Sequence, residues 1–215
     1  ISIITIGFIT VFYTSFGGIK SVIWVDLIQW SVYIGGAVLA AVIILTKLPN
    51  GFNDLIDLTF KSGKANWFNI GNDLTFSQFI QQPYTFFTAV FGGAIFSLAS
   101  HGTDQLIVQR VLTCGKLRSS QKAIAFSGLV VLFQFVLFLF LGLLLFTYYK
   151  GQKIAELELL RIDGIFPKFI VEVLPSGISG LIVAALFATA MSTLAGSLSS
   201  LSSSTILDIY IPLFC

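Results

Sequence analysis

Charged residues are scarce in this sequence. Asp, Glu, Lys and Arg together make up 10% of its 215 residues, whereas hydrophobic residues make up 56%. Because soluble domains contain about 25% charged residues, this composition excludes an ordinary soluble protein. The mean hydropathy of +0.94 instead indicates an integral membrane protein whose main partner is the lipid bilayer. The net charge of +2 gives no indication of a nucleic-acid partner.

Cysteine, histidine and methionine are also rare. Cys114 and Cys215 make no disulfide framework, so we expect free thiols. His101 is the only histidine and Met191 the only methionine. The sequence begins at Ile1 within an apolar run, and we therefore expect an internal piece of a larger membrane protein. It has no CxxC, phosphate-binding loop or Ser/His/Asp arrangement, so we do not expect an enzyme.

Long apolar runs are present, and they predict an all-α membrane protein with about five membrane-spanning helices. The run from 123 to 149 has no charge over 27 residues, whereas a bilayer requires about 20. The predicted spans are 1–16 (partial), 22–46, 84–108, 123–148 and 172–205.

The charges of the connecting loops predict how these spans are oriented. Loop 109–122 contains four cations and no acid, and such loops stay in the cytoplasm. We therefore place loops 17–21 and 109–122 in the cytoplasm. Loops 47–83 and 149–171, in which both signs of charge occur, are placed outside, and the first of them has room for one short helix.

Hydroxyl residues crowd the last predicted helix. On a helix of about 100° per residue, one stripe contains Thr189, Ser192, Thr193, Gly196, Ser200 and Ser203. Hydroxyl oxygens suit a small hard cation, whereas small residues also permit close packing between helices. Spacing alone leaves both interpretations open, and an ion site itself needs helices close enough to supply oxygens from two sides.

Asp26 lies about one turn inside the predicted span 22–46. Acids within the membrane are energetically costly and usually face a bundle interior, a water path or an ion. Alternatively, Asp26 lies at the interface, where a carboxylate stabilises the positive end of the helix dipole. Both roles remain open.

Polar residues also interrupt the second half of the predicted span 84–108. His101 and Asp104 are three positions apart and are able to share a helix face, but two ligands do not make a metal site, and we expect His101 to be a packing residue. We expect Asp104 to pair with Arg110 or Lys116 at the membrane interface.

Three stretches resemble the sodium/solute symporter family, which includes sodium–glucose, monocarboxylate, sialic acid and iodide cotransporters. They are YTSFGGIKSVIWVDLIQ, DQLIVQRVLTCGKLRSSQKA and GLIVAALFATAMSTLAGSLSSLSSSTILDIY. The resemblance covers nearly the whole sequence. It implies part of an inverted-repeat (five-plus-five helix) transporter core with sites at mid-membrane. The third span would then be a broken, substrate-facing helix, interrupted within 97–103, where Gly102 is the clearest helix breaker.

The resemblance also implies a set of site residues. Na⁺ would be the coupling ion, bound by Thr189, Ser192 and Thr193. Asp26 aligns with an acid near the inner sodium exit, which in some members contributes to a second sodium site. The other half of the main site would come from a core helix outside this sequence.

The substrate-facing residues implied by the resemblance are Ser97, Ser100, His101, Val131 and Gln134. Sugar-transporting members have a lysine at the position of Val131 and a gating tyrosine at the position of Ser100, so a sugar substrate is not favoured. Gln134 is a buried amide that needs a partner, and this is either another helix or the substrate.

We therefore expect a sodium-coupled symporter in the plasma (inner) membrane that imports a small polar organic solute by alternating access. One alternative is a proton-coupled transporter with the same core. Another is a transporter-like sensor module joined to a signalling kinase. The sequence leaves the solute, the sodium stoichiometry and the oligomeric state undecided.

Overall fold

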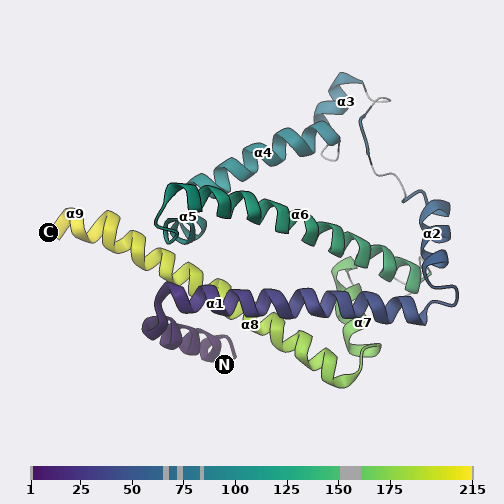
Figure 1. The fold of residues 1–215 in the computed structure, drawn as a ribbon, viewed down its shortest axis with the longest axis horizontal. Helices are drawn as coiled ribbons and strands as arrows, with labels where there is room; N and C mark the ends of the chain where they lie inside the picture. The colour runs from purple at the N-terminus through teal and green to yellow at the C-terminus, as the bar shows by residue number, and fades with distance from the viewer. Residues whose placement is uncertain (1, 65–67, 72–74, 83–84, 151–160, 215) are drawn as a thin grey trace.

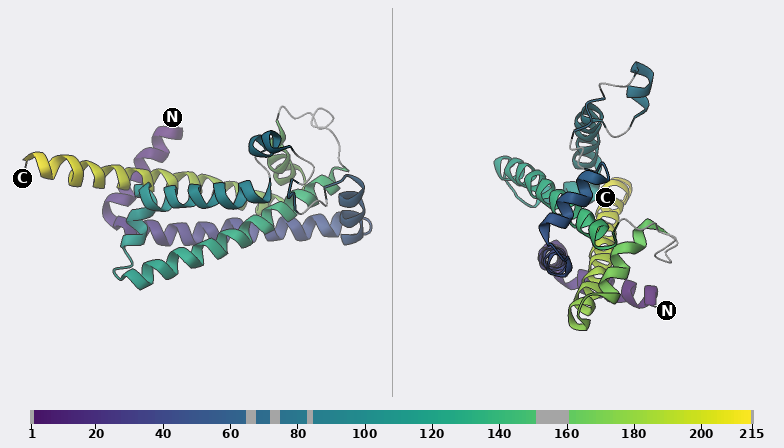
Figure 2. Two further views of the ribbon diagram at one scale, coloured as in Figure 1. Left: turned by 90° about the horizontal axis from the view of Figure 1, so that it is seen from above. Right: turned by 90° about the vertical axis from the view of Figure 1, so that its right-hand side faces the viewer.

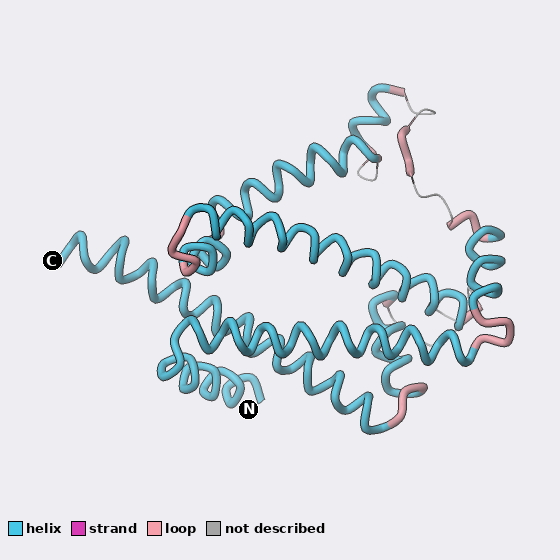
Figure 3. The backbone as a smooth tube through the Cα atoms, in the orientation of Figure 1, coloured by secondary structure: helices cyan, strands magenta, loops and turns pink. Residues whose placement is uncertain are grey.

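The computed structural model describes residues 2–64, 68–71, 75–82, 85–150 and 161–214, and this part of the chain is helical without strands (Figures 1 and 3). The main elements are α1 (Ser2–Lys47), α2 (Phe52–Lys61), α3 (Phe76–Gln81), α4 (Phe86–Thr103), α5 (Gln105–Leu112), α6 (Leu117–Tyr148), α7 (Ile165–Glu172) and α8 (Ser176–Ser204). A 3-10 turn, η2 (Ile162–Gly164), precedes α7, whereas a π-helix, η3 (Thr205–Tyr210), and the short α9 (Ile211–Phe214) extend α8.

Within the described residues, four helical stretches are long and apolar enough to cross a membrane. They are Val22–Lys47, Phe86–Thr103, Leu117–Tyr148 and Ser176–Phe214, and a shorter apolar stretch covers Gly7–Phe16. This all-α arrangement agrees with the fold class predicted from the sequence. The last helix continues past the predicted end at residue 205, because the backbone passes through η3 into α9 without leaving helical conformation.

The predicted turn at residues 17–21 does not interrupt the helix. The backbone is helical from Ser2 to Lys47, and the first part of α1 instead bends away from the rest (Figures 1 and 2). Helices often kink where glycine occurs, and Gly17 and Gly18 lie in this stretch. A bent helix keeps its backbone hydrogen bonds, which a lipid environment requires.

The predicted span 84–108 is two helices rather than one. α4 ends at Thr103 and α5 begins at Gln105, with Asp104 in extended conformation between them (φ −74°, ψ 107°). The Asp104 carboxylate accepts a hydrogen bond from the backbone N–H of Leu106 at 3.0 Å and so caps α5. The predicted interruption therefore exists, but it follows the 97–103 segment, because an aspartate cap ends the helix and Gly102 does not.

The connecting segments contain more helix than the loop predictions allowed. Segment 47–83 holds both α2 and α3, where one short helix was predicted, and segment 149–171 contains most of α7. The predicted helix 172–205 begins later, at Ser176. Pro175 precedes this helix, because proline lacks the backbone N–H that a helix interior needs.

The hydrophobic core lies where α1, α6 and α7 meet. Its fully buried side chains include Ile44 of α1, Leu144 of α6, and Phe169 and Ile170 of α7. The ring of Tyr148 packs edge-on against Phe169, with 5.5 Å between the ring centroids. This cluster holds one end of α1 in place.

Helix α8 crosses α1 (Figure 1), and its Ile182 belongs to the same hydrophobic cluster. Gly36 lies at this crossing, where an added Cβ atom would be 3.1 Å from Cγ1 of Ile182 in α8. A small residue therefore lets the two backbones approach closely. This close approach brings the polar residues of α1 within reach of those of α8.

Replacing Phe169 with alanine should destabilise the full-length protein by about 3–5 kcal/mol, the usual range for a buried phenylalanine. The measurement is the thermal-unfolding midpoint in detergent. Phe60→Ala is the matched control, because Phe60 of α2 is 68% exposed. Equal destabilisation by the two variants would contradict a core centred on Phe169.

Candidate functional site

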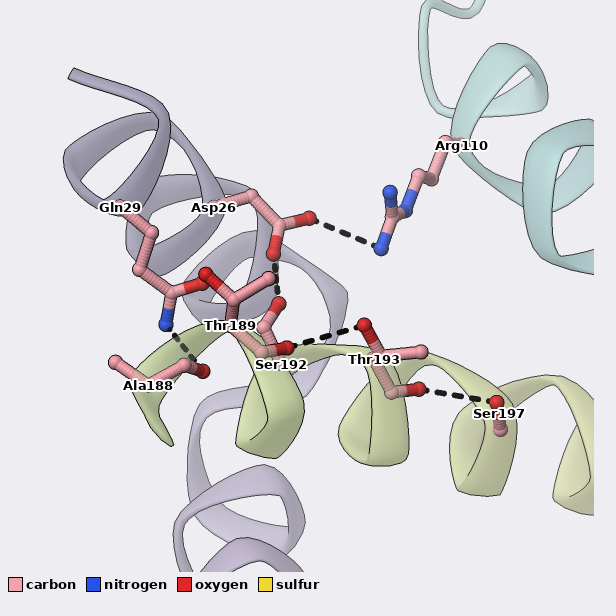
Figure 4. Close-up of polar contacts among 8 residues, drawn as sticks. All are labelled: Asp26, Gln29, Arg110, Ala188, Thr189, Ser192, Thr193 and Ser197. Carbon is pink, nitrogen blue, oxygen red and sulfur yellow. Dashed lines mark hydrogen bonds and ion pairs between the residues drawn. The ribbon is translucent and has the colours of Figure 1, made fainter. Parts of the chain in front are cut away.

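A pocket of about 290 Å³ lies between α1, α5 and α8. Its lining residues are Asp26, Gln29, Trp30, Tyr33, Leu106, Arg110, Thr189, Ser192 and Thr193. The four residues predicted to bind sodium, Asp26, Thr189, Ser192 and Thr193, are all among them. Figure 4 shows these four side chains on the facing sides of α1 and α8.

A hydrogen bond from Ser192 to Asp26 joins the two helices across this pocket. The Ser192 hydroxyl donates to Oδ1 of Asp26, and Ser192 is only 4% exposed. Asp26 does not lie at a helix N-terminus, because α1 is helical from Ser2 onward. Its carboxylate therefore faces a partner helix, and stabilising the first turn of its own helix is not its role.

Arg110 of α5 is the third member of this polar cluster. Its Nη2 atom lies 2.9 Å from Oδ2 of Asp26. The predicted pairing of Asp104 with Arg110 or Lys116 is therefore wrong for Arg110, whose partner is on α1. The carboxylate of Asp104 is engaged in capping α5.

The hydroxyl groups of Thr189 and Thr193 are oriented by their own helix. Thr189 donates to the carbonyl oxygen of Ala185 at 2.9 Å, and Thr193 donates to that of Thr189 at 3.0 Å. A hydroxyl has two lone pairs besides its hydrogen. Because both hydrogens point back along the helix, the lone pairs of both oxygens remain able to coordinate a cation.

Gln29 is a pocket residue to which the sequence analysis assigned no role. It lies three residues after Asp26, which places the two on one face of α1. Its side-chain amide donates to the carbonyl oxygen of Ala188 at 2.7 Å, and Gln29 is buried. A polar residue at this spacing from an intramembrane acid was the signal available in the sequence.

The C-terminal part of the hydroxyl-rich α8, beyond Gly196, serves helix packing. Gln109 of α5 donates to the hydroxyls of Ser203 at 3.0 Å and Ser199 at 3.4 Å. Between these contacts and the pocket lies Gly196, which is buried against Leu106 and Arg110. The two interpretations of the stripe therefore apply to different parts of it: hydroxyls line the pocket near Thr189, and packing dominates from Gly196 onward.

The five predicted substrate-facing residues do not converge on this pocket. Ser97, Ser100 and His101 cluster on α4, where Nδ1 of His101 lies 3.0 Å from the carbonyl oxygen of Ser97 and 3.1 Å from the hydroxyl of Ser100. Val131 is exposed on α6. Gln134 accepts a hydrogen bond of 2.6 Å from Tyr33 of α1, so this amide has another helix as its partner.

The sequence of this chain is similar to those of known sodium-coupled transporters. The model of the sodium:solute symporter family matches residues 1–214. The sodium/sialic acid symporter SiaT of Proteus mirabilis is 30% identical, over 97% of this chain and 41% of its own length. The sodium-coupled monocarboxylate transporter 1 of Mus musculus is 29% identical, over 99% and 34%. The sodium-dependent multivitamin transporter of Oryctolagus cuniculus is 30% identical, over 100% and 33%.

A solved structure shows the same fold. The substrate-bound outward-open state of a Na⁺-coupled sialic acid symporter superposes with a TM-score of 0.74 at 30% identity, over 95% of this chain and 42% of the other. The chain thus spans less than half the length of the relatives it matches. The named relatives are transporters rather than enzymes. From the family match along nearly its whole length and the shared helical fold, the chain belongs to the sodium:solute symporter family.

Proposed function

We propose that the full-length protein is a sodium-coupled symporter that imports a small polar organic solute by alternating access in the plasma membrane. One observation carries this proposal. The family resemblance implies Asp26, Thr189, Ser192 and Thr193 as sodium ligands, and all four line one pocket between α1 and α8.

The chemistry of this pocket suits sodium. Na⁺ is a small hard cation that prefers oxygen ligands, and the pocket offers the hydroxyls of Thr189, Ser192 and Thr193 and the carboxylate of Asp26. The remaining ligands of the main site would come from a core helix beyond this chain. Loop 109–122 contains four cations, and with this loop in the cytoplasm the Asp26 end of the pocket lies toward the cell interior.

Sodium would drive uptake by shifting a conformational equilibrium. An ion shifts an equilibrium only as far as its affinity differs between the two states. A site built from two helices binds sodium with different affinity in the two states, because its oxygens converge only when α1 and α8 are correctly placed. Sodium bound there would favour the outward-open state, and release to the sodium-poor interior would allow the return.

For the solute, we propose an organic acid as the first class to test. Two relatives are named for sialic acid and for monocarboxylates, and both of these solutes carry a carboxylate. The lysine and tyrosine of sugar-transporting relatives are replaced here by Val131 and Ser100, which does not favour a sugar. Ser97 and His101 of α4 remain predicted solute contacts, whereas the side-chain amide of Gln134 is engaged by Tyr33 of α1.

Replacing sodium with choline should abolish concentrative uptake by the full-length protein in proteoliposomes. The probes are radiolabelled sialic acid, a short-chain monocarboxylate and a vitamin, each with glucose uptake as the comparison. Uptake driven by a proton gradient in choline would favour the proton-coupled alternative. Specific binding of a probe without uptake under either gradient would favour the sensor module and contradict a symporter.

Ser192→Ala should raise the sodium concentration for half-maximal uptake about tenfold, which corresponds to about 1.4 kcal/mol of lost binding. The substitution removes one oxygen from the pocket and one hydrogen bond from Asp26. Ser197→Ala is the matched control, because Ser197 lies on the same helix and donates to the carbonyl oxygen of Thr193 without lining the pocket. An unchanged sodium response in Ser192→Ala would remove Ser192 from the site.

A further inference from the structure

The proposed sodium site contains a cation of the protein itself. Asp26 has two carboxylate oxygens, and both are engaged: Oδ1 accepts from Ser192, whereas Oδ2 lies 2.9 Å from Nη2 of Arg110 (Figure 4). Among the residues that the structure describes, Asp26 alone supplies an acid to the lining of this pocket. The negative charge that would attract Na⁺ is therefore already matched by a guanidinium group.

The packing of α5 against α8 leaves room for the side chain of Arg110 to reach Asp26. A Cβ atom added at Gly196 would lie 3.2 Å from Nη2 of Arg110, so a glycine in α8 leaves room for the guanidinium. The neighbouring Gln109 holds α5 on α8 through Ser203 and Ser199. Because Gln109 makes these contacts independently, α5 would stay attached to α8 if Arg110 left Asp26.

We propose that Arg110 is a tethered cation that exchanges with sodium at Asp26. This inference rests on the proposed function and adds a residue that sets sodium affinity. Two cations at one carboxylate repel each other strongly at short distance. Sodium therefore reaches Asp26 as Arg110 withdraws, and Arg110 returns when sodium leaves.

The exchange would keep the carboxylate of Asp26 paired with a cation when sodium is absent. An unpaired charge in a membrane span is energetically costly, and removing one partner of a partly buried ion pair exposes that cost. With Arg110 in place, Asp26 keeps a counter-charge in the sodium-free carrier. The sodium-free protein is then able to change conformation without carrying an uncompensated carboxylate.

The test is a double-mutant cycle on sodium binding, measured with sodium alone. The full-length protein is purified in choline, and its thermal-unfolding midpoint is recorded against NaCl, with choline chloride at equal ionic strength as the reference. Arg110→Gln should lower the half-maximal sodium concentration at least about fivefold, the lower end of typical couplings between sites. Arg110→Lys, which keeps a cation, should restore a value near that of the native protein.

The second half of the cycle separates exchange at Asp26 from simple repulsion. In an Asp26→Asn background, Arg110→Gln should leave the half-maximal sodium concentration unchanged, because no carboxylate remains to compete for. An equal decrease in both backgrounds would show repulsion alone and overturn the exchange. Lys116→Gln is the charge-matched control: Lys116 lies close to Arg110 in the sequence but does not line the pocket.

The outcomes also distinguish this inference from the proposed function. If the native protein shows no midpoint shift with sodium beyond that with choline, the sodium-coupled function itself fails. If the native protein responds to sodium and Arg110→Gln binds sodium with native or weaker affinity, the exchange fails and the sodium site stands. Because the readout is a concentration, a general loss of stability in a variant does not mimic either result.

Discussion

The structure depends on the contact between Asp26 of α1 and Ser192 of α8. A carboxylate in a membrane span needs partners, because lipid supplies none. Ser192 provides one from α8 and Arg110 provides another from α5. These contacts bring three helices to one point, and the pocket that we propose for sodium lies around that point.

Small residues make this convergence sterically possible. Gly36 lets α8 pass close to α1, and Gly196 leaves room for the guanidinium of Arg110. At the other end of α1, bulky side chains such as Phe169 and Leu144 fill the core. The helix is thus held by apolar packing at one end and by polar contacts near Asp26, a division that lets a polar pocket coexist with a stable fold.

Local patterns in the sequence predicted part of this arrangement. Helical spacing alone placed Thr189, Ser192 and Thr193 on one face, and apolar length predicted the spans. The partner of Arg110 was not predictable in this way, because α1 and α5 are far apart in the sequence and pattern analysis sees only neighbours. The break at Asp104 was displaced for a different reason: an aspartate is able either to cap a helix or to pair with a cation, and only tertiary structure decides between them. Gln29 was overlooked although its spacing from Asp26 was visible, because its acceptor, the carbonyl oxygen of Ala188, lies on a helix far away in the sequence.

The single extended residue between α4 and α5 has a mechanical consequence. Rotation about the backbone of Asp104 would swing α5 as a lever without unwinding either helix, because both keep their own hydrogen bonds. The far end of that lever carries Arg110 and leads into the 113–116 turn, where Cys114 is exposed. A displacement at Asp26 would thus be transmitted through α5 to the connection with α6, with Asp104 as the pivot.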